Sequence, residues 1–264
     1  MNKILIVGKN SYIGTSFFKL HDSKNEIHFA DSRNDNWKSV DFSEFTTILH
    51  CAGIAHQKRV SRALYDSVNR DLAVAVAKKA SASGVKQFIF LSSVAANENA
   101  KDFYGASKFE AEKQLLDLET EDFKICIVRP PMVYGAGCKG NFPRLVRLAK
   151  LLPVFPEIPN KRSMIYIENL CEFLSILIHE TRNGIHLPQN KDWVNTTELV
   201  TLIRHFHGKK TFTTRIFNAP IIFLAKRIPT LNKIFGDLAY PHCGDEISYN
   251  KVSFTEGVKN SLMD

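Results

Sequence analysis

The stretch that predicts the fold is Lys3-Ile4-Leu5-Ile6-Val7-Gly8-Lys9-Asn10-Ser11-Tyr12-Ile13-Gly14. Residues 3–7 form a short apolar run that ends at Gly8, a pattern typical of a buried strand, and residues 12–20 have helical character. Glycine in the turn between them permits unusual dihedrals and lets a pyrophosphate approach backbone N–H groups at the helix start. Ser11 stands where a middle glycine is common. The stretch favours a dinucleotide-binding turn over a plain strand-to-helix connection.

Strand and helix patterns alternate from this turn onward. Strands are expected at 26–30, 46–51, 87–91 and 124–128, with a further strand after a very short crossover beside 46–51. Helices are expected at 61–83 and 103–119. The first of these carries an apolar stripe of Leu64, Val68, Leu72, Val76 and Ala80. The alternation predicts an α/β fold with a mostly parallel, doubly wound sheet.

Composition limits the partners. The chain has 264 residues, a net charge of +8 and a pI of about 9.2, so an anionic partner is expected. No cluster of cations interleaved with aromatics stands out, which disfavours nucleic acid. The five cysteines are odd in number and none forms a C-x-x-C pair, which favours free thiols and no metal site. With no signal-peptide pattern and no long apolar run, a cytoplasmic protein is expected.

Tyr104 and Lys108 are the candidate catalytic pair. They are four residues apart, so on a helix they share one face. An ammonium beside the phenol is expected to lower the pKa of Tyr104. A serine from Ser92-Ser93, at the end of the 87–91 strand, would hold a substrate oxygen. Together these groups suit an alcohol–ketone interconversion.

Further candidates surround the glycine turn. Asp31 ends the second strand, where an acid holds the ribose hydroxyls of NAD, whereas Arg33 would accept a 2′-phosphate, so NAD is favoured and NADP stays open. Gly53 would let backbone approach a cofactor. His56, just past a strand end, is either a substrate contact or an ordinary loop residue. Asn69 is expected to bond neighbouring backbone or order the site.

The ordered set of motifs resembles the extended short-chain dehydrogenase/reductases, specifically nucleotide-sugar epimerases and 4-ketoreductases. The resemblance runs from residue 3 to about 180. It is carried by the following segments: Gly8–Gly14, His50-Cys51-Ala52-Gly53, Val68-Asn69-Arg70-Asp71, residues 88–93, Tyr104-x-x-x-Lys108, residues 129–135, Gly140-Asn141-Phe142 and residues 162–170. Among these enzymes the chain is most similar to UDP-glucose 4-epimerase-like proteins of bacterial polysaccharide pathways.

The resemblance implies roles for individual residues. Tyr104 would be the acid/base, Lys108 would lower its pKa and hold the nicotinamide ribose, and Ser93 rather than Ser92 would bind substrate. Substrate contacts are expected at His56, Ser93, Asn141 and Arg162, the last on a diphosphate. Cofactor contacts are expected at Gly8, Asn10, Ser11, Tyr12, Ile13, Gly14, Asp31, Arg33, Asp41, Phe42, Cys51, Ala52, Gly53, Asn69, Tyr104, Lys108 and Pro131.

Three departures from the family pattern stand out. Ser11 replaces a glycine, the segment between Ser93 and Tyr104 is unusually short, and a second diphosphate-binding arginine has no clear counterpart near the C-terminus. The resemblance also implies the domain plan. Residues 1–131, rejoined by 163–187, would form a Rossmann-like NAD(P)-binding domain. Residues 132–162 and 188–264 would form a small C-terminal substrate-binding lobe.

The predicted function is a nucleotide-sugar 4-epimerase, of UDP-hexose or UDP-N-acetylhexosamine type, working through a 4-keto intermediate with bound NAD. The alternatives are an NAD(P)H-dependent 4-ketoreductase and a non-catalytic dinucleotide-binding module. A 4,6-dehydratase is disfavoured because Val94-Ala95, rather than an acid and base, follow Ser93. A homodimer is expected.

Residues 199–236 contain no acid, while Arg204, Lys209, Lys210, Arg215, Lys226, Arg227 and Lys233 alternate with apolar residues. One interpretation is weak peripheral contact with an anionic membrane. The other is a solvated basic face near a diphosphate, and the sequence alone favours this second interpretation.

Overall fold

A six-stranded parallel sheet forms the centre of the computed structural model, which describes residues 2–33, 35–55, 60–241 and 246–263. The strand order is β2-β1-β3-β4-β5-β9. The bounds are β1 Lys3–Val7, β2 Glu26–Ala30, β3 Thr47–His50, β4 Gln87–Leu91, β5 Lys124–Val128 and β9 Gly184–His186. The order reverses between β1 and β3, and ligands of open α/β sheets bind beyond the carboxyl ends of the strands at such a point.

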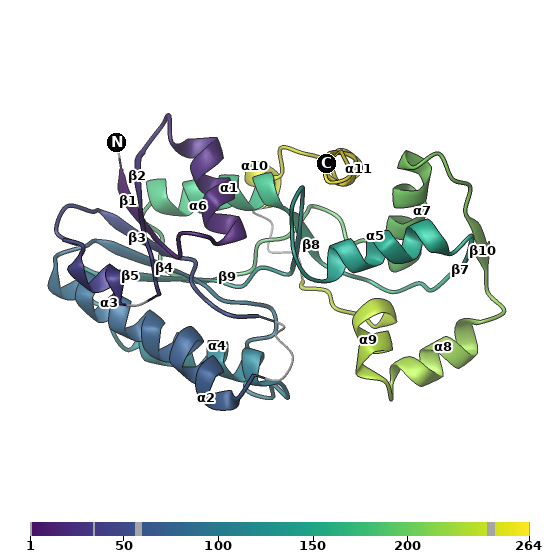
Figure 1. Ribbon diagram of the computed structural model, residues 1–264, viewed down its shortest axis with the longest axis horizontal. Helices are drawn as coiled ribbons and strands as arrows, with labels where there is room; N and C mark the ends of the chain where they lie inside the picture. Colours follow the sequence, from purple (N-terminus) through teal and green to yellow (C-terminus); the bar gives the residue numbers. More distant parts are fainter. Residues whose placement is uncertain (1, 34, 56–59, 242–245, 264) are drawn as a thin grey trace. The chain divides into compact units, whose positions relative to one another are not determined.

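Helices cover both faces of this sheet (Figure 1). On one face lie α1 (Tyr12–His21) and α6 (Ile167–His179), and on the other lie α3 (Leu72–Ala82) and α4 (Phe103–Leu116). Every residue of β3 and β4 is buried, as expected for strands covered on both sides. The predicted doubly wound α/β fold is therefore confirmed.

The apolar stripe of the helix predicted at 61–83 is wrong at Leu64, whereas Val76 and Ala80 are buried as predicted. The helix consists of α2 (Arg62–Tyr65), a π-helical turn η2 (Asp66–Asp71) and α3. A π turn holds more residues than an α turn, so the buried face is rotated. Leu64 is 46% exposed, and the residues that face inward are instead Tyr65 and Asn69. The π turn thus turns a polar amide toward the core. The extra strand expected beside 46–51 is also wrong, since the described residues between β2 and β4 contain no strand other than β3.

The chain divides into two compact units. The first comprises residues 1–130 and 171–188, and the second comprises residues 131–170 and 189–264. The boundary falls inside α6. Among the described residues, no helix combines the length and the apolar composition needed to cross a bilayer.

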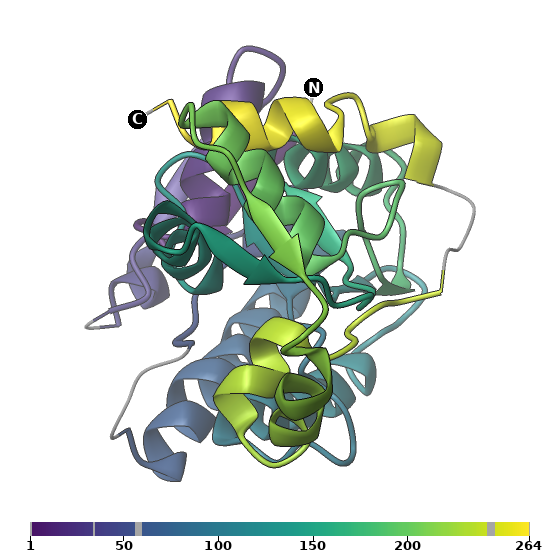
Figure 2. The same cartoon turned by 90° about the vertical axis from the view of Figure 1, so that its right-hand side faces the viewer.

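The second unit is built from short elements. Two parallel pairs of strands, β6–β8 and β7–β10, are accompanied by small helices (Figures 1 and 2). The bounds are β6 Met132–Tyr134, α5 Asn141–Leu151, β7 Val154–Pro156, β8 Met164–Tyr166, α7 Thr196–Phe206, β10 Phe212–Thr214, α8 Asn218–Ala225, α9 Pro229–Phe235, α10 Glu246–Tyr249 and α11 Phe254–Asn260.

An aromatic cluster fills the centre of the second unit. The Tyr134 ring lies 5.4 Å from that of Phe142 and 5.5 Å from that of Tyr166, measured between centroids. The buried Tyr134 hydroxyl accepts a 2.9 Å hydrogen bond from Asn190. A Cβ on Gly257 would lie 2.9 Å from the Tyr166 ring, so glycine lets α11 approach this cluster closely. This packing holds β6, β8 and α11 together.

Candidate active site

The two serines at the carboxyl end of β4 have different partners. Ser92 is 4% exposed and donates a short hydrogen bond to the buried carboxylate of Glu112. Ser93 is half-buried, its hydroxyl accepts from Ala95 N at 3.2 Å, and it also hydrogen-bonds the Tyr104 side chain. The arrangement therefore gives Ser93, and not Ser92, access to the reactive phenol.

Tyr104 lies in the first turn of α4. This helix begins where Asp102 accepts a 2.7 Å hydrogen bond from Gly105 N, a side-chain cap of the usual kind. A Cβ on Gly105 would overlap the carbonyl oxygen of Ala95. The short segment after Ser93 therefore packs directly against this turn, and it can do so because residue 105 is a glycine. The trimmed loop thus brings serine and tyrosine together.

Lys108 is buried one turn farther along α4, with an exposed fraction of 4%. Its Nζ donates to Leu91 O at 2.8 Å and lies 4.3 Å from the centroid of the Phe90 ring. Burial lowers the pKa of Lys108 from 10.5 to about 8, and the nearby Cys51 and Glu112 oppose this shift. The ammonium is thus fixed at the carboxyl end of β4.

That Lys108 lowers the pKa of Tyr104 stays a prediction, because the net shift in this arrangement is upward. Burial raises the pKa of the Tyr104 phenol, the Ser93 hydrogen bond opposes that rise, and Asp102 and Tyr65 add to it. The ammonium is directed at the carbonyl of Leu91, because the helical spacing sets which face a side chain occupies and not where its end points.

Asn69 connects the π turn to two other parts of the site. Its Oδ1 accepts from Ile54 N at 2.8 Å, and its Nδ2 donates to Ile54 O at 3.0 Å and to Ser107 Oγ at 3.1 Å. It therefore fixes the segment after β3 against α4, as the sequence predicted for an ordering role. That Asn69 also contacts the cofactor stays a prediction. Its side-chain amide already makes three hydrogen bonds within the chain.

Gly53 leaves room beside Lys108. A Cβ at this position would lie 3.0 Å from Asn69 Oδ1 and 3.3 Å from Lys108 Nζ. Gly8 has a φ of +117°, and a Cβ there would lie 2.8 Å from Ala52 N. The glycine turn and the segment after β3 thus meet at close range, at the point where the strand order reverses. Both glycines are needed for this approach.

Ser11 takes a local role in the glycine turn. Its hydroxyl caps α1 by accepting from Gly14 N at 3.0 Å, and it also bonds the Cys51 thiol. Burial raises the pKa of Cys51 to about 12, so the thiol stays protonated. The serine that departs from the glycine pattern therefore starts the helix. Asn10 is exposed at the turn, and Tyr12 and Ile13 are half-buried in the first turn of α1.

Asp31 and Arg33 line a pocket of about 620 Å³ in the first unit. The Asp31 carboxylate accepts from Arg33 N at 2.9 Å and from its Nε at 3.3 Å, which holds the pKa of Asp31 below its usual value. The opposite wall comes from the π turn and α3, including Ser67, Val68 and Asp71. Two predicted residues therefore face a cavity bounded by the π turn.

The other two predictions near this pocket fare differently. Asp41 accepts from Ser43 N at 2.9 Å and from its Oγ at 2.7 Å, so its carboxylate forms a local turn. The Phe42 side chain is fully buried, with the ammonium of Lys79 4.6 Å from its ring centroid. That Phe42 contacts the cofactor stays a prediction, and the burial of the whole residue argues against it.

The predicted residues of the second unit are described within that unit. Pro131 is buried after β5, and Asn141 is half-buried at the start of α5. Arg162 is 7% exposed, and its Nη1 donates to Gly236 O at 3.0 Å and to Ile234 O at 3.4 Å. A solvated Arg162 is therefore excluded, and its contact with a diphosphate stays a prediction. His56 lies outside the described residues.

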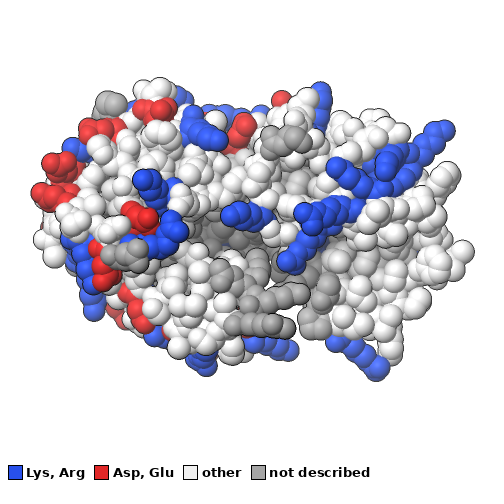
Figure 3. Space-filling model, in the orientation of Figure 1, with Lys and Arg blue, Asp and Glu red and all other residues white. Residues whose placement is uncertain are grey.

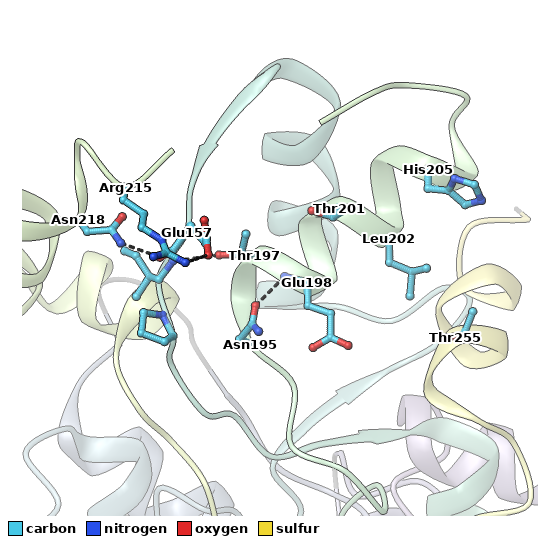
Figure 4. A pocket seen from close by; sticks show the side chains of 12 residues that line it. Glu157, Asn195, Thr197, Glu198, Thr201, Leu202, His205, Arg215, Asn218 and Thr255 are labelled. Atoms are coloured by element: carbon cyan, nitrogen blue, oxygen red, sulfur yellow. Dashed lines mark hydrogen bonds and ion pairs between the residues drawn. The ribbon is translucent and has the colours of Figure 1, made fainter. Parts of the chain in front are cut away.

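A second pocket, of about 840 Å³, lies within the second unit (Figure 4). Arg215 Nη2 donates to Glu157 Oε1 at 2.7 Å, and Asn218 Nδ2 donates to Glu157 O at 2.6 Å. Glu198 and Thr201 project from α7 into the same space. None of the residues predicted from the sequence lines this pocket.

Two supporting residues, Glu112 and Lys79, escaped the sequence analysis. Glu112 is 2% exposed, bonds Ser92, and receives the guanidinium of Arg129, with Nε 2.9 Å from Oε1. Lys79 Nζ donates to the carbonyls of Lys38 and Val40 at 2.5 and 2.7 Å, fixing the chain beside the pocket. Glu112 lies four residues after Lys108, so helical spacing was an available signal. Nothing in the local sequence marks Lys79.

Comparison with known proteins now adds the family. The model described as "NAD dependent epimerase/dehydratase family" matches residues 4–194. The UDP-glucose 4-epimerase of Vibrio cholerae is 32% identical over 240 residues, covering 75% of this chain and 73% of that protein. The N-acetyl-alpha-D-glucosaminyl-diphospho-ditrans,octacis-undecaprenol 4-epimerase of Escherichia coli O157:H7 is 26% identical over 249 residues, with 79% and 73% covered. Both relatives fit the predicted epimerase.

Solved structures share the fold. UDP-N-acetylglucosamine 4-epimerase from Methanobrevibacter ruminantium M1 has a TM-score of 0.75 at 15% identity, covering 98% of this chain and 96% of its own. The dTDP-4-dehydrorhamnose reductase of Bacillus anthracis str. Ames, in complex with NADP, has a TM-score of 0.69 at 20% identity, covering 99% and 98%. These likenesses confirm the predicted fold, and together with the family match they agree with the predicted cofactor. The chain belongs to the NAD dependent epimerase/dehydratase family.

Proposed function

We propose that this chain is a nucleotide-sugar 4-epimerase that works through a 4-keto sugar and keeps its NAD bound. The observation that carries the proposal is the hydrogen bond between Ser93 and Tyr104 at the carboxyl end of β4, on the helix that also buries Lys108. This edge of the sheet is where family members and open α/β sheets in general bind their ligands. The two 4-epimerases among the relatives support the reaction type.

The first unit fits a dinucleotide on its own evidence. The lack of a side chain at Gly8 lets the backbone of Ala52 approach the turn, and the lack of one at Gly53 leaves space beside Lys108 Nζ. The pocket beside Asp31 is also lined by Trp37, whose buried Nε1 has no hydrogen-bond partner among the described residues. An unpaired buried N–H is costly and is expected to meet an acceptor. NAD, when bound there, would supply reversible hydride transfer at the sugar C4.

The side chains of the site would handle the proton. Tyr104 would accept the proton of the C4 hydroxyl as the ketone forms and return it when the alcohol is restored. Ser93 would hydrogen-bond the C4 oxygen and, in the absence of substrate, stabilise the phenolate. Because burial raises the pKa of Tyr104, the phenol needs a compensating positive charge, and Lys108 is the buried cation nearest in the sequence of α4. Turning the 4-keto sugar over before its reduction would invert C4.

The reductase remains the second candidate because of one relative. The ceramide reductase of Caulobacter vibrioides is 34% identical over 172 residues, which cover 64% of this chain but only 52% of that protein. A reductase would use the same Ser93, Tyr104 and Lys108 with exchangeable NAD(P)H. The two candidates differ in whether the cofactor stays on the protein through turnover.

The deciding experiment is incubation of the purified chain with sugars and no added cofactor. The substrates are UDP-glucose, UDP-N-acetylglucosamine and N-acetylglucosaminyl-diphospho-undecaprenol, the last two because relatives are named for these sugars. Interconversion of a 4-epimer pair supports the epimerase, and NAD extracted from the protein by denaturation identifies its cofactor. Turnover of a 4-keto sugar only with added NAD(P)H would replace the epimerase with the reductase. No turnover with any of them, and no effect of Tyr104→Phe on ligand binding, would favour a binding module.

The homodimer and the cytoplasmic setting predicted from the sequence belong to the same proposal. Sedimentation equilibrium of the purified chain tests the first, and fractionation of the native cell tests the second. A monomer at all accessible concentrations would remove the homodimer and leave the chemistry unaffected.

A further inference from the structure

Two acid-free segments of the sequence belong to the second unit. Residues 131–156 contain four cations and no acid, and residues 199–236 contain seven cations and no acid. The cations of the first segment are Lys139, Arg144, Arg147 and Lys150. A run of one sign over this length creates a strong local potential. The sequence by itself does not show that the two segments lie together.

The structure joins them. β7 pairs with β10 in parallel, with Val154 opposite Phe212. Lys209 Nζ donates to Lys150 O at 2.9 Å, and Arg204 on α7 donates from Nη1 to Ala149 O of α5 at 2.7 Å. Two segments that are separated by more than forty residues therefore form one continuous surface. We call the exposed cations and apolar side chains on these segments the basic–apolar surface.

The cations of this surface point to solvent, with two exceptions. Arg204 is buried, and Arg215 is paired with Glu157. The other cations whose burial is described are exposed: Lys139, Arg144, Arg147, Lys150, Lys209, Lys210, Lys226 and Arg227. Figure 3 shows blue side chains gathered, without red ones, over the part of this face where α5 and α7 lie. The uncompensated charge is therefore presented to the outside.

Large apolar side chains lie among these cations. Ile216 is 81% exposed, Leu151 is 76% exposed and Phe212 is 63% exposed. Val154 and Phe212 are cross-strand partners, so their side chains project from the same face of the β7–β10 pair. Leu151 follows Arg147 by four residues and shares its side of α5. Charge and apolar area are thus interleaved rather than segregated.

Helix α8 continues the apolar part. Three consecutive residues, Ile222, Phe223 and Leu224, are each exposed by at least 41%. Consecutive helical positions point in different directions, so α8 presents apolar side chains around most of its circumference. A helix that is apolar on all sides is normally buried in protein or in lipid. Arg227 lies 4.3 Å over the Phe223 ring and places a cation at the same helix.

We propose that the basic–apolar surface docks on the headgroup region of an anionic lipid bilayer. Exposed lysine and arginine attract anionic headgroups, and exposed leucine, isoleucine and phenylalanine enter the boundary between headgroups and acyl chains. The structure therefore assigns the second unit a membrane-facing role that is separate from the Ser93–Tyr104 site. Of the two interpretations left open by the sequence, the exposed apolar side chains now favour the membrane over a merely solvated face.

Two other occupants fit the surface less well. A nucleic acid would use the cations but would leave side chains such as Ile216 and Leu151 without a role, since phosphate contacts are polar. A protein partner would require acidic groups spaced to match cations that lie on α5, between α7 and β10, and just after α8. A bilayer needs no such match, because its anionic headgroups are mobile. The occupant with the fewest geometric demands is the lipid surface.

The test is vesicle co-sedimentation of the full chain. One set of vesicles contains phosphatidylcholine alone, and the other contains equal parts of phosphatidylcholine and phosphatidylglycerol. The wild-type chain is expected to sediment with the second set only, and high salt is expected to release it. The charge variant is Lys209→Glu with Lys210→Glu, and the apolar variant is Ile216→Ser with Phe217→Ser. Each is expected to weaken vesicle binding by about tenfold or more.

Matched controls come from the first unit. Lys24→Glu with Lys86→Glu changes the net charge by the same amount at exposed positions, and Leu116→Ser removes an apolar side chain that is 37% exposed. These variants are expected to bind vesicles as the wild type does. Circular dichroism shows whether each variant is folded, and a second pair, Lys226→Gln with Arg227→Gln, replaces any that is not.

Three results would overturn the proposal. The first is the absence of wild-type binding to the phosphatidylglycerol vesicles. The second is an equal loss of vesicle binding in the first-unit controls. That result would show that vesicle binding depends on the net charge of the chain and not on this surface. The third is a change from dimer to monomer in the apolar variant without any vesicle binding by the wild type, which would make this surface a contact between two copies of the chain.

Discussion

Lys108 in the first unit and Arg162 in the second are both buried cations that the sequence marked as ligand-binding residues. Lys108 is 4% exposed and Arg162 is 7% exposed. Both donate to backbone carbonyls, and burial lowers the pKa of each. Neither has a carboxylate as a hydrogen-bond partner among the described contacts. Burial and charge alone therefore do not distinguish Lys108 from Arg162.

What surrounds each cation separates them. Lys108 donates to one carbonyl, and Gly53 leaves space next to its Nζ. Arg162 is held by side chain and backbone together, because its N–H and carbonyl pair with Val194 at 2.9 and 3.0 Å while its guanidinium holds the end of α9. An ammonium has three donors and a guanidinium has five, so donor number does not separate the two cations. The difference is that Arg162 is also anchored through its backbone to the fold of its unit.

The largest effect is expected from a substitution in the first unit, where the predicted catalytic residues lie. Tyr104→Phe removes the proton acceptor but keeps the ring, so we expect kcat to fall by about 10³-fold or more. Folding and cofactor content should change little, because the lost group is one hydroxyl hydrogen-bonded to Ser93. Turnover assays and extracted cofactor measure the two outcomes. A variant that keeps more than a tenth of wild-type kcat would exclude Tyr104 as the acid/base.

Ser93→Ala is the control for that prediction. It removes the hydrogen bond that opposes the rise in the pKa of Tyr104, so that pKa should rise further. Because Tyr104 accepts the proton as a phenolate, the acidic limb of the activity profile should move to higher pH, together with a loss of kcat. A loss of kcat with an unchanged profile would show that Ser93 acts on substrate alone.

Lys108→Met tests the same region through stability. The folded-state pKa of about 8 lies below the ordinary value of 10.5, so the unfolded chain binds this proton more tightly. The stability of the wild type relative to Lys108→Met should therefore rise between about pH 8 and pH 10.5, by roughly 3 kcal/mol. Below pH 8 the buried charge costs stability, and the variant should be the more stable protein although it is inactive.

Denaturant unfolding of both proteins across this pH range measures the difference. Taking the difference cancels the contribution of Tyr104, whose raised pKa acts in the opposite direction, and it retains the interaction between Cys51 and Lys108. A difference that is flat from pH 8 to 10 would show that Lys108 is not a desolvated ammonium.

Arg162→Met tests whether the buried cation of the second unit stabilises the fold or binds a ligand. It removes one donor from the carbonyls of Gly236 and Ile234, which both keep Asn160 as a donor, so it should cost about 1 kcal/mol of stability. Arg144→Met, at an exposed position of the same unit, should cost less than about 0.5 kcal/mol. Urea unfolding gives both values. If Arg162→Met instead leaves stability unchanged and raises KM about tenfold or more, the predicted diphosphate contact is the correct role.

The sequence predicted the first unit well because its signals are local. Strands such as β1 and β4 are apolar runs bounded by turn residues, and their predicted bounds match the structure. The choice of Ser93 over Ser92 came from the family resemblance, and the structure agrees because Glu112 occupies Ser92. Spacing placed Tyr104 and Lys108 on one helix. It did not reveal where Nζ points, because that depends on Leu91 O and Phe90 of a different element.

The second unit was harder because its contacts are not local. Arg162 receives its partners from residues more than seventy positions away, and no periodicity records such a contact. The π turn was missed for a related reason. An extra residue in one turn leaves the helical pattern almost intact, yet it exposes Leu64 and buries Asn69. Both failures concern orientation rather than the presence of an element.

Trp37→Phe carries the smallest expected effect and extends the comparison to a third buried donor. The Nε1 of Trp37 is buried, lines the pocket beside Asp31, and has no hydrogen-bond partner among the described residues. Unlike Lys108 and Arg162, it thus contributes a desolvation cost without a compensating bond. Phenylalanine keeps the aromatic packing against Phe42 and removes the N–H, so the cofactor-free protein should gain about 0.5–1 kcal/mol of stability.

The same variant should bind NAD about fivefold more weakly if Trp37 meets an acceptor on the bound dinucleotide, since a neutral hydrogen bond contributes about 1 kcal/mol. Titration calorimetry with NAD and thermal unfolding without it separate the two effects. Unchanged affinity for NAD together with increased stability would show that the unpaired N–H of Trp37 destabilises the fold and has no role in binding. Weaker binding together with increased stability would instead show that the first unit keeps a donor unpaired in order to bind its cofactor, which neither of the two buried cations does.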